Sequence, residues 1–523
     1  MPQYLGLDAS TQSMTGLIVD TDAREIVAEE SINFDEHFAA RYGIENGVLD
    51  EGDGVVHSFP LMWIESLELL LVRLRESGQD LSKIAAVSGS GQQHGTVYLN
   101  ASATAALRGL ETDSSLFDQL AGIFSRDTAP IWMDSSTNRQ CREIEEAVGG
   151  QAALLELTGN TAFERFSGPQ IRRFFQDEPE AYAVTATISL VSSFMASVLA
   201  GKLVCIDAGD GSGTNLMDIR TRNWSVVAQQ ATATGLADLM APIASSAEPA
   251  GSIHPYFVKK YGFTNDCLVL PFSGDNPCSL IGLGLVNPGQ AALSLGTSDT
   301  LFSCMVEPRF SSEGEGCVFS SPDDIHYMAL ICFMNGSLAR EAVRDQYKLD
   351  WQGFTEILHT TQAGNKGRMM LPYFDREILP NVPAGVVRKG LAEDDVAGNV
   401  RAVIEAQAIS SYIHSRWMGV DITSLNVTGG GSANEEILKV FANVHGCPVH
   451  RFETTNAAAL GAALKAVKGH QTNLSWSSIA DSFCQPSGST IHPDQPLSAL
   501  YDDVIAAYVD LECDHCRQVS FSH

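Results

Sequence analysis

Short apolar runs and longer amphipathic stretches alternate along the chain. Apolar runs over residues 4–8, 15–20 and 26–28 are separated by polar turns, which predicts three strands that fold back on one another. Between residues 59 and 75 apolar side chains recur at helical spacing, which predicts an amphipathic helix. Another short apolar run over 84–88 predicts a fourth strand. Strands that alternate with helices in this way indicate an α/β fold.

The pattern of the first hairpin occurs a second time. Residues 5–12 read Leu-Gly-Leu-Asp-Ala-Ser-Thr-Gln, and residues 293–300 read Leu-Ser-Leu-Gly-Thr-Ser-Asp-Thr. Each segment predicts a strand, a tight turn that carries hydroxyl groups, and a returning strand. The two copies lie too far apart for an array of small repeats, so they predict two lobes of similar construction.

Turn signals divide the chain. Asn-Pro-Gly at residues 287–289 is typical of a boundary turn. We therefore expect an N-terminal lobe over 1–286 and a C-terminal lobe over 287–470. Residues 471–523 would form a C-terminal extension, in which the spacing of apolar residues predicts a final amphipathic helix.

The net charge of the chain limits the classes of partner that we expect it to bind. Its 523 residues include 33 Lys and Arg and 63 Asp and Glu, so the formal net charge is −30. Such a chain repels nucleic-acid backbones and anionic lipid surfaces, and we expect it to bind neither. A single anionic ligand such as ATP remains possible, because helix N-termini and Mg²⁺ neutralise charge locally.

The number and spacing of the cysteines and the hydropathy pattern indicate where in the cell we expect the protein. An odd number of cysteines, 11, is scattered along a large chain, which favours unpaired thiols in a reducing, cytoplasmic environment. Cys513 and Cys516 flank a histidine like half a metal site, but no second ligand pair is near, so we interpret them as ordinary thiols. No apolar stretch approaches the roughly 18 residues of a membrane span.

The two hairpin turns are candidate phosphate-binding elements. Backbone N–H groups and hydroxyls in tight turns form anion-binding concavities, and two matched turns could clasp phosphates from opposite sides. Asp8, at the end of its strand, is placed to hold Mg²⁺ directly or through water. Either turn alone would also suit ordinary Asp/Ser/Thr turn chemistry. No GxxxxGK[ST] loop is present, which disfavours a P-loop enzyme.

Asp275 is the candidate general base. It lies between Gly274 and Asn276 after a predicted strand over 267–272. A carboxylate in this position could accept the proton of a substrate hydroxyl while a phosphate is transferred, with Asn276 orienting a sugar. Gly-Asp-Asn-Pro is also good turn chemistry, so a purely structural role remains an alternative.

Further loops carry groups suited to a polyol. The glycine-flanked loop 91–95 follows a strand and holds Gln93 and His94, whose amide and imidazole we expect to donate hydrogen bonds. Segments 132–136 and 164–168 place aromatic or charged groups beside small polar residues. The alternative for each is a solvated side chain or a surface ion pair. The glycines at 429–431, between a predicted strand and a predicted helix, would let a nucleotide approach the backbone closely.

Taken in order, these segments resemble the FGGY carbohydrate kinases of the actin-like ATPase superfamily. The likeness is strongest to the eukaryotic-type branch of that family whose members phosphorylate xylulose. It covers about residues 3 to 470 and rests on the segments 5–12, 91–95, 132–137, 164–166, 211–213, 274–277, 294–300 and 428–434.

The resemblance implies two ribonuclease-H-like lobes with ATP and a sugar in the cleft between them. It implies ATP- and Mg²⁺-dependent phosphorylation of a ketopentose, D-xylulose to D-xylulose 5-phosphate in the first place, with Asp275 as the base and Asp8 near the metal. The implied sugar-binding residues are Gln93, His94, Asp134, Arg165, Asp275 and Asn276. The implied ATP-binding residues are Asp8, Ser10, Thr11, Gln12, Gly296, Thr297, Ser298, Trp351, Gly430, Gly431 and Asn434.

The chain departs from the family pattern at two positions. Many relatives carry Lys or Arg just after the first phosphate loop, where this chain has Met14 and Thr15. Many also carry an arginine where this chain has Ser136, and the branch it most resembles shares the serine.

Three alternatives stay open at this stage. The protein could be an FGGY kinase for ribulose, gluconate, glycerol or a deoxy-ketose. It could be an actin-like ATPase without a sugar substrate, although about 50 residues after 470 are few for a separate peptide-binding domain. A sugar-binding relative without catalysis is disfavoured by Asp275 and the two phosphate loops. A homodimer is the default expectation for oligomeric state.

Overall fold

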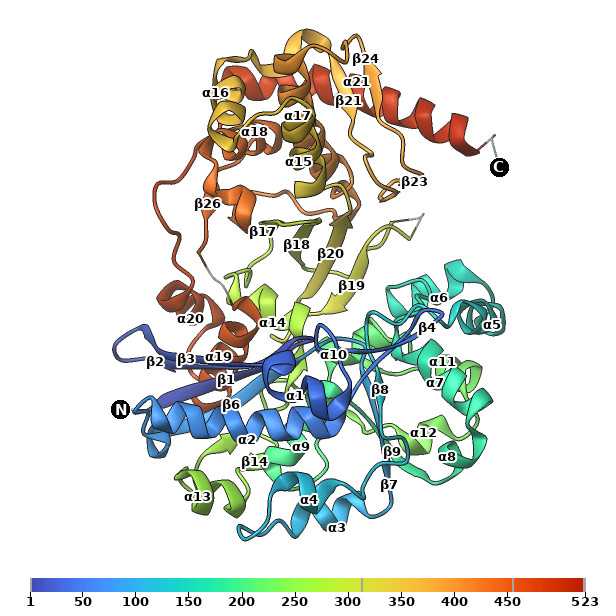
Figure 1. Cartoon of the computed structure of the whole chain (residues 1–523), viewed down its shortest axis with the longest axis vertical. Coiled ribbons are helices and arrows are strands. Elements are labelled where there is room, and N and C mark those ends of the chain that lie inside the picture. The colour runs from blue at the N-terminus through green and yellow to red at the C-terminus, as the bar shows by residue number, and fades with distance from the viewer. Residues whose placement is uncertain (1, 312–313, 454–455, 521–523) are drawn as a thin grey trace.

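The computed structural model describes residues 2–311, 314–453 and 456–520, and it shows two mixed β-sheets, one in each half of the chain (Figure 1). The N-terminal sheet has the order β14-β15-β6-β1-β2-β3, with β16 also pairing with β6. The C-terminal sheet has the order β19-β20-β18-β17-β25-β26. The α/β fold and the two-lobed architecture predicted from the sequence are confirmed.

The strands of the N-terminal sheet are β1 (Gln3–Ala9), β2 (Ser13–Asp20), β3 (Glu25–Asn33), β6 (Ile84–Gly91), β14 (Gly251–Ser252), β15 (Leu268–Val269) and β16 (Ser273–Gly274). Those of the C-terminal sheet are β17 (Gln290–Leu295), β18 (Asp299–Met305), β19 (Cys317–Ser320), β20 (Tyr327–Phe333), β25 (Ser424–Thr428) and β26 (Val449–Arg451).

The register of the first sheet assembles polar residues at one edge. β1 runs antiparallel to β2 and parallel to β6, with Asp8 opposite Ser90. β16 also runs parallel to β6, with Ser273 opposite Ser90. Because the carboxyl ends of parallel strands meet at the same edge, Asp8 and the residues that follow Gly274 come together there.

The C-terminal sheet repeats this construction, as the second copy of the hairpin pattern predicts. β17 runs antiparallel to β18 and parallel to β25, with Ser294 opposite Thr428. The turn between β17 and β18 thus corresponds to the turn between β1 and β2. The glycine segment after Thr428 then lies at the carboxyl edge of this sheet, facing the other lobe.

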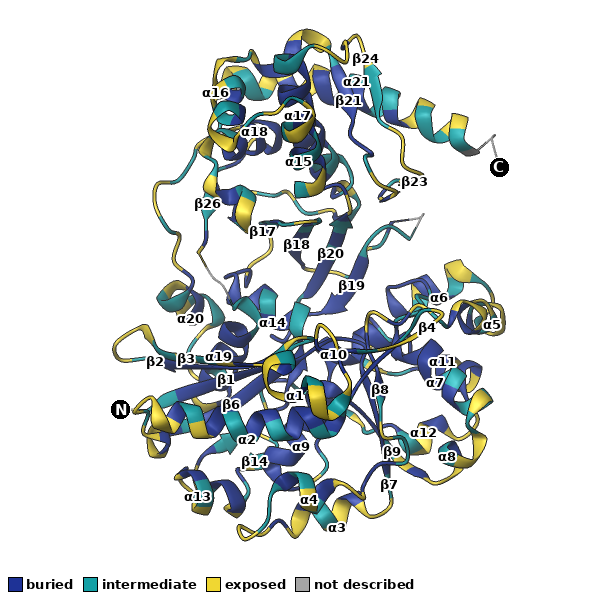
Figure 2. Cartoon of the chain, viewed as in Figure 1, coloured by how far each residue is buried: buried dark blue, intermediate teal, exposed yellow. Residues whose placement is uncertain are grey.

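Two helices cover opposite faces of the N-terminal sheet. The helix predicted over 59–75 is α2 (Pro60–Glu76), and it packs with Leu5 and Leu7 of β1. On the other face Tyr4 packs with α19 (Ala457–His470), a helix from the C-terminal part of the chain. Figure 2 shows these packed surfaces as buried, with the exposed residues on the outer sides.

The α19 helix also crosses α14 (Asp275–Gly282) with almost no side chain between the two backbones. A β-carbon on Gly461 would lie 1.8 Å from the carbonyl oxygen of Cys278, and one on Gly282 would lie 1.9 Å from that of Ala457. Both positions therefore need glycine for close approach of the helices.

The remaining helices of the N-terminal half are α1 (Phe34–Tyr42), α3 (Ala103–Arg108), α4 (Leu116–Leu120), α5 (Asn138–Val148), α6 (Gln151–Thr158), α7 (Ser167–Asp177), α8 (Pro179–Ala183), α9 (Val191–Ala200), α10 (Ala208–Gly211), α11 (Val226–Thr232), α12 (Leu236–Leu239) and α13 (Pro255–Tyr261). Those of the C-terminal half are α15 (Ser337–Gln346), α16 (Trp351–Thr360), α17 (Val396–Ile413), α18 (Glu435–His445), α20 (Trp476–Phe483) and α21 (Gln495–Ser520).

Small sheets complete the fold: β4 (Leu49–Gly52) with β5 (Val55–Ser58) and β8 (Ala129–Pro130), β7 (Thr96–Asn100) with β9 (Thr185–Leu190), β10 (Ile206–Asp207) with β13 (Ile243–Ala244), β11 (Met217–Asp218) with β12 (Asn223–Trp224), β21 (Met369–Leu371) with β24 (Val387–Lys389), and β22 (Glu377–Ile378) with β23 (Asn381–Val382). Within the described ranges no helix is both long enough and apolar enough to cross a membrane.

Three strands differ in length from the sequence prediction by more than two residues. The strand expected over 26–28 is β3, which continues to Asn33 because β2 pairs with it to that end. The strand expected over 84–88 continues to Gly91, because both β1 and β16 pair with it to its end. The strand expected over 267–272 is only two residues long, β15, because it lies between the short β14 and the start of β6. The predicted final helix is confirmed as α21.

Candidate functional site

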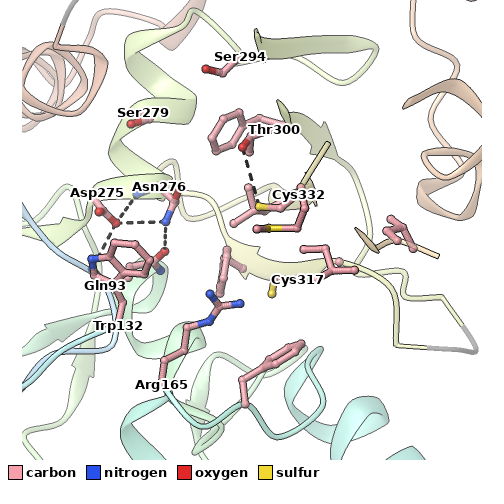
Figure 3. Close-up of a pocket in the computed structure, with 18 of the residues that line it drawn as sticks. Gln93, Trp132, Arg165, Asp275, Asn276, Ser279, Ser294, Thr300, Cys317 and Cys332 are labelled. Atoms are coloured by element: carbon pink, nitrogen blue, oxygen red, sulfur yellow. Dashed lines mark hydrogen bonds between the residues drawn. The ribbon is translucent and has the colours of Figure 1, made fainter. Parts of the chain in front are cut away.

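A cleft of about 2160 Å³ lies between the two sheets. Its lining includes Asp8, His94 and Asp275 from the N-terminal half, and Ser294 and Thr300 from the C-terminal half. Figure 3 shows Asp275, Ser294 and Thr300 in this cleft. Pockets for one small ligand usually measure about 300–1000 Å³, so this cleft has room for two.

Asp275 is the first residue of α14, and its carboxyl group has one engaged oxygen and one open oxygen. Its Oδ1 accepts hydrogen bonds from the backbone N–H of Asn276 at 2.8 Å, from Asn276 Nδ2 at 3.2 Å and from the backbone N–H of Gln93 at 3.3 Å. No described residue donates to Oδ2. Burial raises the pKa of Asp275 and the hydrogen bonds lower it, and burial outweighs them, so that the pKa is raised to about 6. A carboxylate with an open oxygen and such a pKa is suited to accept a proton near neutral pH.

Asp8 is a second carboxylate at the same edge, and it is buried. Its Oδ1 accepts a hydrogen bond from Ser90 Oγ at 2.6 Å. Burial raises the pKa of Asp8 to about 7, and the charge of the nearby Asp275 adds to the rise. No cation among the described residues contributes to the pKa of either carboxyl group. Oxygen ligands that lack a neighbouring cation fit Mg²⁺, which is often held by one or two carboxylates together with water and phosphate oxygens.

The loop 91–95 brings Gln93 and His94 to the base. Gln93 Oε1 accepts a hydrogen bond from Asn276 Nδ2 at 2.9 Å, so the two amides hold each other beside Asp275 (Figure 3). His94 Nδ1 lies 2.6 Å from the carbonyl oxygen of Gly213, and its ring stacks on Phe166 at 4.2 Å.

The sequence prediction that His94 donates to a ligand is wrong in one respect. A carbonyl oxygen can only accept, so Nδ1 carries the proton. Burial and the charge of Arg165 lower the pKa of His94 to about 3, and the ring is therefore neutral. Its remaining nitrogen, Nε2, is left as a hydrogen-bond acceptor for a ligand hydroxyl.

Asp134 and Arg165 both line the cleft, but they differ in how far their side chains are already hydrogen-bonded. Asp134 is buried and already bonded: Oδ2 accepts from the Val56 N–H at 3.1 Å, and Oδ1 accepts from Gln170 Nε2 at 2.8 Å. Arg165 makes no hydrogen bond or ion pair with any described residue, and its guanidinium lies 5.4 Å from the Phe163 ring centroid. In Figure 3 it points into the cleft towards the wall that carries Cys317. Its donors are open to a ligand.

The two candidate phosphate hairpins lie where the repeat predicts. Ser10, Thr11 and Gln12 form the turn between β1 and β2, and Gly296, Thr297 and Ser298 form the turn between β17 and β18. None of these six residues belongs to the lining of the cleft, so their contact with phosphate stays a prediction.

Residues 14 and 15, where many relatives carry Lys or Arg, lie inside the N-terminal sheet. Met14 and Thr15 are buried on β2. A cation that sequence reasoning missed lies behind the second hairpin instead. The buried Arg340 pairs with Asp299 at 2.9 and 3.0 Å and donates to the carbonyl oxygen of Gly296 at 3.2 Å. Its sequence signal is a single arginine on the apolar face of a helix.

The candidate adenosine-binding residues cluster at the start of α18. Gly430 lines the cleft, whereas Gly431, Asn434 and Trp351 do not. The Asn434 side chain caps α18 and donates to Thr355 Oγ1 at 2.7 Å. Thr355 Oγ1 in turn donates to the carbonyl oxygen of Trp351, so Asn434 and Trp351 are linked through Thr355.

Lys465 is another residue that sequence reasoning missed. It is buried on α19, and its Nζ lies 3.5 Å from Asp207 Oδ2 and 3.2 Å from the carbonyl oxygen of Pro271. Asp207 also accepts a hydrogen bond from Ser273 Oγ at 2.8 Å, two residues before Asp275. This buried pair therefore supports the segment that carries the base. A lysine within an alanine-rich predicted helix was its signal.

The C-terminal helix reaches the rim of the cleft. Glu512 of α21 accepts a hydrogen bond from Tyr373 at 2.9 Å and pairs with His414 Nε2 at 3.1 Å. His414 Nδ1 lies 3.5 Å from Glu315, which lines the cleft, as does Cys516. Burial lowers the pKa of His414, but its bonds to the two glutamates outweigh burial and raise it to about 9. Cys513 is exposed.

Comparisons with known proteins agree with this architecture. Residues 127–282 match the N-terminal domain of the FGGY family of carbohydrate kinases, and residues 291–469 match its C-terminal domain. The chain is 42% identical to xylulose kinase 2 of Arabidopsis thaliana, covering 95% of this chain and 90% of the relative. It is 40% identical to xylulose kinase of Rattus norvegicus, covering 97% and 96%.

A solved structure supports the fold independently. The crystal structure of xylulose kinase from Rhodospirillum rubrum superposes with a TM-score of 0.83 at 18% identity, covering 99% of this chain and 100% of that one. Both domain models match in the expected order, and the curated relatives match over nearly their whole length. The chain belongs to the FGGY family of carbohydrate kinases.

Proposed function

We propose that this protein transfers the γ-phosphate of ATP to the terminal hydroxyl of a ketopentose, and that D-xylulose is converted to D-xylulose 5-phosphate. The observation that carries the proposal is the open Oδ2 of Asp275, placed beside Gln93 and Asn276 in a cleft with room for two ligands. Relatives named xylulose kinase match nearly the whole chain, which supports the choice of sugar.

The proposed mechanism needs a base, orientation of the sugar and neutralisation of phosphate charge. Asp275 accepts the proton of the attacking hydroxyl at Oδ2, while its three hydrogen bonds hold Oδ1 in place. His94 Nε2 accepts from a sugar hydroxyl, and Arg165 and Asn276 donate to others. Mg²⁺ held near Asp8 would neutralise charge on the phosphates. Asp134 acts by holding its loop rather than by a free oxygen.

The rest of the predicted site is part of the same proposal. The first turn (Ser10, Thr11, Gln12) and the second (Gly296, Thr297, Ser298) clasp the phosphates, and Gly430, Gly431, Asn434 and Trp351 border the nucleoside. The division into lobes at 1–286 and 287–470 with an extension over 471–523, the homodimer and the cytoplasmic location are proposed with it.

The test is ADP release with Mg·ATP against D-xylulose, L-xylulose, D-ribulose, L-ribulose, glycerol and gluconate. Strong stimulation by D-xylulose alone is the expected result, and Asp275→Asn should lower kcat by about 10²–10⁴-fold with little change in sugar binding. Stimulation by another sugar would overturn the choice of substrate. ADP release at the same rate with and without each of these sugars would overturn the kinase proposal itself.

A further inference from the structure

Trp132 joins two parts of the cleft that lie far apart in the sequence. It follows β8 on a loop of the N-terminal half, is 42% exposed, and lines the cleft (Figure 3). Its indole Nε1–H donates a hydrogen bond to Thr11 Oγ1 at 2.8 Å. Thr11 lies in the turn between β1 and β2, the first candidate phosphate hairpin, so the bond spans from a side wall to that hairpin.

A second hydrogen bond connects Thr11 to Gln92. The Thr11 hydroxyl donates to Gln92 Oε1 at 3.3 Å. Gln92 is buried, and its backbone N–H donates to the carbonyl oxygen of Ala9 at the end of β1. The next residue along the chain is Gln93, whose N–H holds Asp275. An unbroken series of contacts therefore leads from the indole, through the phosphate hairpin, to the proposed base.

The chemistry of these groups fixes the direction of each bond. An indole N–H can only donate, and an amide oxygen can only accept. Thr11 has one hydroxyl proton, which goes to Gln92, so its oxygen must accept from Trp132. Removing the indole N–H leaves the hydroxyl with one anchor instead of two. The Thr11 side chain can then rotate away from the hairpin geometry it has here.

We propose that Trp132 is a positioning residue that holds the first phosphate hairpin through Thr11, so that the loop over 132–136, one of the segments suited to a polyol, sets the geometry of phosphoryl transfer. The inference rests on the proposed kinase function. A sugar that packs against the half-exposed indole would fix the ring, and the ring would fix Thr11. The effect of losing the bond should therefore appear in the KM for ATP or in kcat, although Trp132 lies in a loop suited to a polyol.

The test is a double-mutant cycle with Trp132→Phe and Thr11→Val. Phe keeps an aromatic face and loses the N–H, and Val keeps the shape of Thr and loses the hydroxyl. Each single variant should lower kcat or raise the KM for ATP by about 3- to 10-fold, the usual worth of one hydrogen bond. The double variant should lose no more than the worse single variant, since both act through the same bond.

Matched variants separate this role from general damage. Thr11→Ser keeps the hydroxyl and should lose less than Thr11→Val. Trp224→Phe removes another indole bond, to the carbonyl oxygen of Ala241, and Trp224 does not line the cleft. It should leave the KM for ATP unchanged. Far-ultraviolet circular dichroism and thermal unfolding would show that every variant is folded.

The outcomes are distinct. Effects that multiply in the double variant, or a Trp132→Phe enzyme with wild-type kinetics for ATP, would overturn the inference while the wild-type enzyme still phosphorylates its sugar. A wild-type protein that phosphorylates no sugar would instead overturn the proposed function. A rise in the KM for sugar alone would show that Trp132 acts only as a sugar contact, and would also overturn the inference.

Discussion

Asp275→Asn should stabilise the ligand-free protein at pH 8 although it removes the base. The carboxylate is partly buried at the cleft, and no cation among the described residues compensates its charge. All three of its hydrogen bonds arrive at Oδ1. Asparagine can keep that oxygen in place and offer the same acceptor, while the open Oδ2 becomes an uncharged amide NH₂ group. The substitution therefore relieves the desolvation of a charge and breaks none of these bonds.

The size of the gain follows from the pKa of Asp275. Burial raises it from 3.8 to about 6, and one pH unit is worth about 1.4 kcal/mol, so ionising the folded protein at pH 8 costs about 3 kcal/mol. A folded-state pKa above the unfolded value favours the folded protein fully below pH 3.8, and this contribution is lost as the pH rises through about 6. The advantage of the variant should thus be about 3 kcal/mol at pH 8 and near zero at pH 3.5.

The assay is urea unfolding of both proteins at several pH values between 3.5 and 8, with a chelator and without nucleotide or sugar. Asp266→Asn is the matched control, because Asp266 is exposed and nearby in sequence. It should show no such pH-dependent difference. An Asp275→Asn protein that is less stable than the wild type at pH 8 would refute the reasoning, because it would mean that the carboxylate is stabilised in the folded state.

The remaining predictions concern three charged residues. Lys465→Met leaves Asp207 buried without its cation and should lower the free energy of unfolding by about 3–5 kcal/mol. Urea unfolding measures this loss, and a variant that unfolds at the wild-type midpoint would contradict it. Adding Asp207→Asn to the variant should recover part of the loss. His414→Gln should be less stable than the wild type at pH 6.5, and this gap should close as the pH rises through about 9, where the raised pKa of His414 releases its proton; thermal unfolding at pH 6.5 and 10 measures it, and a gap that widens at pH 10 would refute it. Arg165→Ala should raise the KM for sugar by about 10- to 100-fold, since its donors have no described partner, with steady-state kinetics as the measurement and Arg165→Lys as the closer control.

Much of the fold could be predicted from the sequence, because its signals are local. The hydroxyl-bearing turns after β1 and β17 each follow from a few adjacent residues, and their likeness predicted the two lobes. The strand end and the neighbouring glycine predict Asp275 as a general base, whereas its place in a cleft follows from the family resemblance. The amphipathic α2 and the final helix α21 were likewise readable from their spacing.

The rest depends on contacts between distant segments. The length of β6 is decided by two partner strands, β1 and β16, which no local pattern specifies. The proton position on His94 depends on a carbonyl group 119 residues away. The bond between Trp132 and Thr11 spans 121 residues, and the pair of Lys465 and Asp207 spans 258. Such pairs are set by tertiary packing, so single-sequence reasoning had no means to find them.

The crossing of α14 and α19 has a consequence for the gene. A single-base change in a glycine codon either is silent, introduces a stop codon, or yields a residue with a β-carbon. At Gly282 and Gly461 that atom would fall within 2 Å of a carbonyl oxygen of the facing helix. Every missense allele one base away from these two codons should therefore disturb the joint between the helices, whichever sugar the enzyme accepts. Variation in populations at these codons should be almost entirely synonymous.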